Sequence, residues 1–187
     1  MSRSDEITDE IRQEFPRFRI VRKSESPLSR AIDVALKIAT FGGQREYMTR
    51  YHTVIADTLY VPDRWEDASD VDRAITLRHE RVHLRQRRRY GDVIMTLLYL
   101  VPIFPLGLAY GRARIEWEAY AETLRATADL CGIEAAEDPT LRARIVRQFT
   151  GPAYGWMWPF PRAVGRWCDE VLGEMRRTPT APEPPAR

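Results

Sequence analysis

The sequence is poor in the residues that characterise disulfide-rich proteins and nucleic-acid-binding proteins. It contains two cysteines, Cys131 and Cys168, among 187 residues, too few for a disulfide framework or a cysteine-rich zinc site. The net charge of +2 is too small to indicate a nucleic-acid-binding protein, so we expect no nucleic acid among its partners. The N-terminal segment MSRSDEITDEIRQEF is polar and lacks the apolar core of a secretory signal, which favours a cytoplasmic location.

Caps and breakers divide the chain into helices with a few short strands. Ser69 and the acidic residues that follow it resemble a capping box, and Gly91 ends the helix that they open. Threonine, tyrosine, valine and isoleucine are frequent between residues 47 and 61, which favours one or two strands. Further elements are predicted as helices over 5–15, from 27 to before Gly42, and over 70–90, 112–130, 139–149 and 162–177, with a strand over 18–21.

This pattern predicts a helix-rich α+β fold with a small sheet on the N-terminal side of the 70–90 helix. The length suits one domain, which we place over residues 1–177. Residues 178–187 are rich in proline and are expected to be a disordered tail.

The 70–90 helix contains the motif H-E-x-x-H, which spans His79 to His83. Residues four apart lie on the same face of a helix, so the imidazoles of His79 and His83 can bind one zinc ion. Glu80 is rotated by about 100° from His79, beside the ion rather than on it. In that position it can take a proton from a water molecule activated by the metal, as a general base does.

A third protein ligand must come from elsewhere, and the segment RARIEWEAYAET offers Glu116, Glu118 and Glu122. Helical periodicity places Glu118 near Arg114 and Glu122 near Arg125, on a polar arc that we expect to face solvent. Glu116 instead falls among apolar residues on the face that we expect to be buried. A buried carboxylate is costly unless a cation meets it, so Glu116 is the predicted third ligand.

HERVH followed by Glu116-Trp-Glu-Ala-Tyr-Ala resembles the gluzincin metallopeptidases. The resemblance is to the family that holds the heat-shock membrane protease and the CAAX prenyl-protein proteases, and to the minigluzincins. It covers roughly residues 50–125 and implies a zincin-like fold with Glu116 as the third ligand. The segment TVIADTLYVPDRW resembles the edge strand that these proteases lay beside the substrate. The sequence departs from the family at Tyr120, where the family has an aspartate that supports the site.

One strongly apolar stretch, residues 93–110, raises the question of a membrane. It is slightly shorter than the ~20 residues of a spanning helix, and Pro102 and Pro105 interrupt it. A single span would also put His83 and Glu116 on opposite sides of the bilayer, where they could not share a metal. We therefore expect a buried hairpin under the site, and we keep open a peripheral membrane contact through residues 93–110.

Two further residues are candidates for stabilising the oxyanion of a hydrolytic reaction, namely Tyr154 and His52. Trp156, Trp158 and Phe160 could line the same cleft, although aromatic residues in a helix-rich domain more often belong to the core. The arginines of the 70–90 helix read mainly as a charged surface, with an anionic partner as the alternative.

The predicted function is zinc-dependent hydrolysis of peptide bonds in a peptide or protein substrate, with Glu80 as general base. Two other classes stay open: a catalytically silent zinc-binding protein with this fold, and a basic membrane-surface or anion-binding module without metal. The sequence does not indicate the oligomeric state or the substrate.

Overall fold

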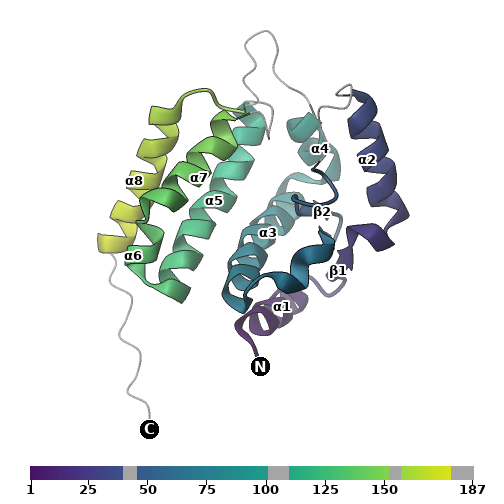
Figure 1. The fold of residues 1–187 in the computed structure, drawn as a ribbon, viewed down its shortest axis with the longest axis horizontal. Coiled ribbons are helices and arrows are strands. Elements are labelled where there is room, and N and C mark those ends of the chain that lie inside the picture. Colours follow the sequence, from purple (N-terminus) through teal and green to yellow (C-terminus); the bar gives the residue numbers. More distant parts are fainter. Residues whose placement is uncertain (40–45, 101–109, 152–156, 178–187) are drawn as a thin grey trace. The chain divides into compact units, whose positions relative to one another are not determined.

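The computed structural model describes residues 1–39, 46–100, 110–151 and 157–177 (Figure 1). The chain divides into two compact units, Met1–Asp92 and Val93–Arg187, which are described separately below. The predicted helix-rich α+β fold is confirmed, because a small mixed sheet accompanies the helices. The single domain predicted for residues 1–177 stays a prediction, and the predicted tail over 178–187 lies outside the described residues.

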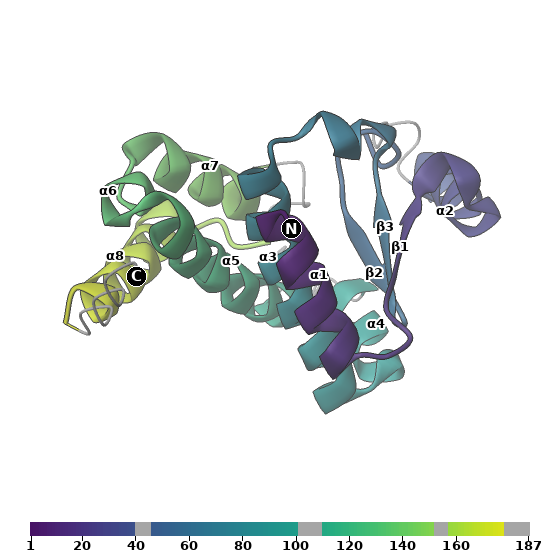
Figure 2. The ribbon, with the colours of Figure 1, turned by 90° about the horizontal axis from the view of Figure 1, so that it is seen from below.

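The first unit contains the sheet, whose strand order is β1-β3-β2 (Figure 2). β1 pairs with β3 in parallel and β2 pairs with β3 antiparallel, so β2 is an edge strand. Apolar side chains of the sheet pack with those of α1 and α3, among them Ile11, Leu59 and Leu77. The elements are α1 (Arg3–Glu14), β1 (Arg19–Arg22), η1 (Lys23–Glu25), α2 (Pro27–Ala39), β2 (Thr53–Ile55), β3 (Thr58–Val61), η2 (Asp63–Asp67) and α3 (Asp70–Tyr90).

The ends of α3 lie where the sequence predicts them. The side chain of Ser69 accepts a hydrogen bond from the backbone N–H of Asp72 at 3.1 Å, which caps the first turn. Gly91 follows the last residue with a φ of +79°, a conformation that glycine adopts without strain. These caps set the bounds of the helix that carries the H-E-x-x-H motif.

Three arginines of α3 converge on one carboxylate of α1. Arg81, Arg85 and Arg88 each place a guanidinium nitrogen 2.8–2.9 Å from a carboxylate oxygen of Glu14. Arg81 also bonds Glu10 at 2.8 Å. Much of the positive charge of α3 therefore joins α3 to α1 inside the first unit, a pairing that the expected charged surface did not include.

The second unit consists of helices, with α5, α7 and α8 side by side (Figure 1). Aromatic rings fill its core: Trp117, Phe149 and Trp167 contact one another with centroid distances of 5.2–6.2 Å. Gly132, with a φ of +91°, follows α5 as predicted. The elements are α4 (Asp92–Leu100), α5 (Tyr110–Cys131), α6 (Ile133–Ala136), α7 (Pro139–Thr150) and α8 (Pro161–Arg177).

The apolar stretch 93–110 forms α4 as far as Leu100, and residues 101–109 lie outside the described residues. Among the described residues, no helix combines the length and apolar character that crossing a bilayer requires. Met95 is buried, but Val93, Ile94 and Leu97 are 73%, 50% and 54% exposed. The expectation of a buried segment is therefore wrong for this face of α4, because packing on one side leaves the other side of a short helix open.

Candidate metal centre

His79 and His83 lie one turn apart on α3, as the H-E-x-x-H spacing predicts. Their ring centroids are 5.1 Å apart and the rings are inclined by 75°. His83 is buried at 7% exposure, while His79 is half-buried. The two imidazoles thus form a pair of nitrogen donors on one helical face, close enough to share an ion.

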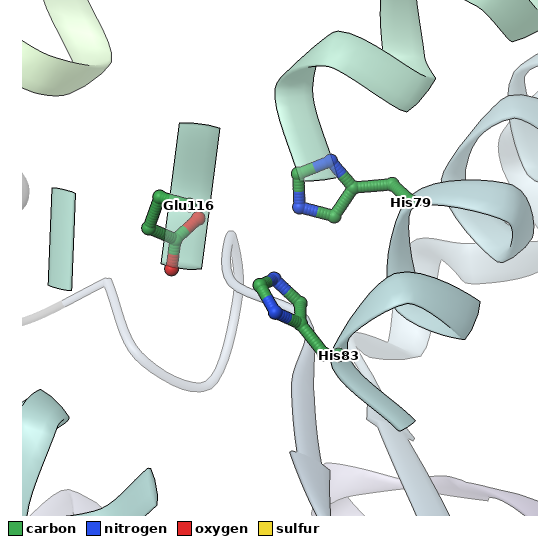
Figure 3. A group of neighbouring side chains, drawn as sticks. All are labelled: His79, His83 and Glu116. Carbon is green, nitrogen blue, oxygen red and sulfur yellow. The ribbon is translucent and has the colours of Figure 1, made fainter. Parts of the chain in front are cut away.

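Glu116 of α5 joins this pair. It is 3% exposed, which confirms the predicted buried position, whereas Glu118 and Glu122 are half-buried rather than exposed. One nitrogen of each histidine and one carboxylate oxygen of Glu116 all lie within 4.8 Å of one another. Figure 3 shows the three side chains pointing toward one another. The three residues predicted as ligands are therefore near one another and could bind a metal ion.

The chemistry of these donors fits zinc. Two imidazoles and one carboxylate are the protein ligands of several catalytic zinc sites, which keep a fourth position open for water. Ligand atoms about 2.1 Å from a tetrahedral ion lie about 3.4 Å from each other. The donor atoms, which lie within 4.8 Å of one another, would therefore move closer together by up to about 1.4 Å to hold the ion.

Glu80, the predicted general base, is also buried, at 6% exposure. It lies between the two histidines in sequence and is not a member of the His79, His83 and Glu116 group. Its charge acts on another buried residue, Lys23. Burial lowers the pKa of Lys23 to about 8, and the carboxylates of Glu80 and Asp33 partly oppose that shift. Glu80 therefore has a buried cation within electrostatic range.

Lys23 is a feature that sequence reasoning missed. Its side chain is 0% exposed, and Nζ donates a hydrogen bond to the Tyr47 carbonyl oxygen at 2.7 Å. Nζ also lies 3.5 Å from the centroid of the Tyr47 ring, a cation–π contact. A lysine in the polar run RKSES reads as exposed, so the sequence carries no signal for this burial.

Gln86 is a second residue that sequence reasoning missed. Its Oε1 lies 2.9 Å from Nδ1 of His83, and its side chain is 4% exposed. With the amide oxygen of Gln86 as the acceptor, Nδ1 of His83 would carry the proton and Nε2 would keep a lone pair for a metal. The sequence signal was available, because Gln86 follows His83 by three residues on the same helix.

Of the two candidates for oxyanion stabilisation, the structure describes His52 but not Tyr154. His52 is half-buried, and its ring meets the Trp65 ring edge-on at 5.3 Å. Burial and the charge of Lys23 lower the pKa of His52 to about 4, so this imidazole is neutral at pH 7. Tyr154 lies outside the described residues. A catalytic role of either residue stays a prediction.

The other aromatic candidates belong to the second unit. Trp156 lies outside the described residues. Trp158 stacks on Trp167 at 5.9 Å, which is the core role weighed for such residues, and it also meets Phe160, which is 50% exposed, at 5.2 Å. Tyr120, where the resembled family has an aspartate, packs edge-on against Phe149 at 5.5 Å. Its ring therefore contributes to the core of the helical unit.

Comparison with known protein families, with curated proteins and with solved structures finds no match to this chain. The resemblance to the gluzincins therefore stays a prediction that rests on two helical motifs.

Proposed function

We propose that this protein hydrolyses peptide bonds with a zinc ion held by His79, His83 and Glu116. The observation that carries the proposal is the proximity of their three donor atoms, all within 4.8 Å of one another. Two histidines on one helix and a glutamate on another are the donor set of a catalytic zinc site of the H-E-x-x-H type. The glutamate between the histidines supplies the base that this chemistry requires.

The roles of the residues follow from their chemistry. A zinc ion bound to these ligands would lower the pKa of a water molecule to about 7 and polarise the substrate carbonyl. Glu80 takes a proton from the attacking water molecule while the water oxygen forms a bond to the carbonyl carbon of the substrate. Glu80 then gives this proton to the amine nitrogen as the C–N bond breaks. Gln86 fixes the His83 ring in the tautomer that leaves Nε2 free.

The edge strand β2 supports a peptide as the substrate. Among the described residues, β2 (Thr53–Ile55) pairs with β3 alone, and it also packs against α3. An exposed strand edge presents backbone groups that an extended peptide can pair with. A peptide bound to β2 would lie near α3, the helix that carries His79 and Glu80.

The alternatives predict different properties. A silent zinc-binding protein would hold the metal with the same ligands and cleave nothing. A basic anion-binding module would need available positive charge on α3, yet Arg81, Arg85 and Arg88 are engaged by Glu14. That observation favours the two metal-binding classes over the module without metal.

Metal content and hydrolysis together test the proposal. We expect one zinc per chain by elemental analysis, and loss of binding in His79→Ala and in His83→Ala. Glu80→Gln should keep the metal and lose cleavage of an unfolded casein substrate, whereas Glu118→Gln on α5 serves as the matched control and should keep both. Absence of bound zinc after zinc addition would overturn the proposal. A zinc-loaded wild type that cleaves no unfolded protein would support the silent class instead.

A further inference from the structure

α4 presents an apolar face to solvent. Val93, Ile94 and Leu97, which follow the spacing of one helical face, are each at least 50% exposed. Met95 and Leu98 are more buried and hold the opposite side of α4. A helix that is apolar on all sides is normally enclosed by protein or by lipid, and described residues cover only one side of this one.

The same unit exposes further apolar side chains on α5 and just before α8. A methyl group added at Gly111 would lie 2.5 Å from Cδ2 of Leu98, so α4 approaches the first turn of α5 closely. The neighbouring Tyr110 is 51% exposed and its ring lies 5.6 Å from that of Trp158. Trp158 in turn meets Phe160, which is 50% exposed, at 5.2 Å. Exposed aromatic rings on α5 and just before α8 therefore belong to the same helical unit as the apolar face of α4.

Positive charge accompanies these aromatic residues. Arg114 is exposed one turn after Tyr110 on the same side of α5, and Arg162 is exposed two residues after Phe160. Tyrosine and tryptophan beside arginine are typical of the boundary between lipid tails and headgroups. Arginines at that depth attract anionic lipids.

We propose that the apolar face of α4, together with the exposed Tyr110 and Phe160, binds the surface of an anionic lipid bilayer without crossing it. The apolar side chains enter the boundary between headgroups and tails, and Arg114 and Arg162 contact lipid phosphates. This inference is independent of the proposed metal centre and adds a membrane partner to it.

A lipid surface fits this face better than a second protein does. A specific protein partner is held in register by hydrogen bonds and by a polar rim. The exposed side chains of Val93, Ile94 and Leu97 offer no hydrogen-bonding group. The sequence from Val93 to Tyr110 also contains no charged residue. A fluid bilayer requires no such register, only apolar area and complementary charge.

Flotation of the full chain with lipid vesicles tests the proposal. Wild type should float with vesicles of phosphatidylcholine and phosphatidylglycerol, and more weakly with phosphatidylcholine alone. The double variant Ile94→Glu, Leu97→Glu should bind at least about tenfold more weakly to both. The matched control is Ile133→Glu on α6, also an exposed isoleucine of the second unit, which should bind as wild type does.

A second pair of substitutions separates charge from apolar contact. Arg114→Gln with Arg162→Gln should weaken binding to the anionic vesicles alone. Circular dichroism of each variant checks that it folds, and Leu97→Ser replaces the double variant if that one does not. Wild type that fails to float, or equal losses in Ile133→Glu and the double variant, would overturn the proposal. So would a wild-type dimer in sedimentation equilibrium that Ile94→Glu dissociates without any vesicle binding.

Discussion

Nδ1 of His83 lies 2.9 Å from Oε1 of Gln86, and both side chains are buried. This contact joins a predicted metal ligand to a residue one turn further along α3. A buried acceptor on one ring nitrogen orients the imidazole and leaves the other nitrogen for a metal. The relationship makes Gln86 a positioning residue of the candidate centre.

Replacing Gln86 should therefore weaken zinc binding without removing a ligand. We expect Gln86→Ala to lower zinc affinity by about tenfold, because the His83 ring loses its orienting partner. Gln86→Glu should keep most of the affinity, since a carboxylate still accepts from Nδ1. Competition titration against a chromophoric chelator measures both. Gln13→Ala on the exposed side of α1 is the control, and an equal loss there would assign the effect to general stability.

Glu116 should be the glutamate of α5 on which zinc affinity depends. Glu116→Ala is expected to weaken affinity about tenfold or more, because a ligand is lost. Glu118→Ala and Glu122→Ala should leave affinity nearly unchanged, since neither residue belongs to the group of donor atoms. The same titration compares the three variants. A large loss in Glu118→Ala with none in Glu116→Ala would show that the helical phase is misassigned.

Lys23 should make stability rise with pH in mildly alkaline solution. Burial lowers its pKa from 10.5 to about 8, so between these values the unfolded chain binds a proton that the folded chain has released. The free energy of unfolding then increases with pH. From pH 8 to 9.5 the gain relative to Lys23→Met should be on the order of 1–2 kcal/mol.

Urea unfolding at several pH values measures this difference. Lys37→Met is the matched control, because Lys37 is 47% exposed and bonds Asp33 at 2.6 Å. The control should follow the pH dependence of wild type. Parallel curves for wild type and Lys23→Met would show that the buried ammonium does not titrate in this range.

Glu14 should contribute to stability through the three arginines that meet it. Hydrogen bonds from Arg85 and Arg81 lower the pKa of Glu14 from 4.5 to about 2. Its contribution is complete above pH 4.5 and is lost as the pH falls toward 2. Glu14→Gln should destabilise the protein by about 1–2 kcal/mol at pH 7, and less at pH 3.

Thermal or urea unfolding at both pH values tests this expectation. Glu10→Gln is the control, because Glu10 is 53% exposed and bonds only Arg81 among the arginines of α3 in the described ion pairs. It should have a smaller effect. A larger loss in Glu10→Gln than in Glu14→Gln would contradict the assigned network.

The sequence by itself determined the local features of the candidate centre. The spacing of His79 and His83 sets their common face, since 3.6 residues per turn bring every fourth residue into line. Ser69 and Gly91 determine the ends of α3 because capping depends on residues next to the helix. Helical phase likewise predicted that Glu116 is buried. Each of these inferences needs only neighbours within one or two turns.

The tertiary structure decided which distant residues meet these local features. Lys23 is buried near Glu80, and Glu14 faces three arginines more than sixty positions away in the chain. The sequence pattern also could not predict the open face of α4, because it shows that a segment is apolar but not which residues cover it. Periodicity describes one element at a time, whereas burial and charge pairing depend on contacts between elements.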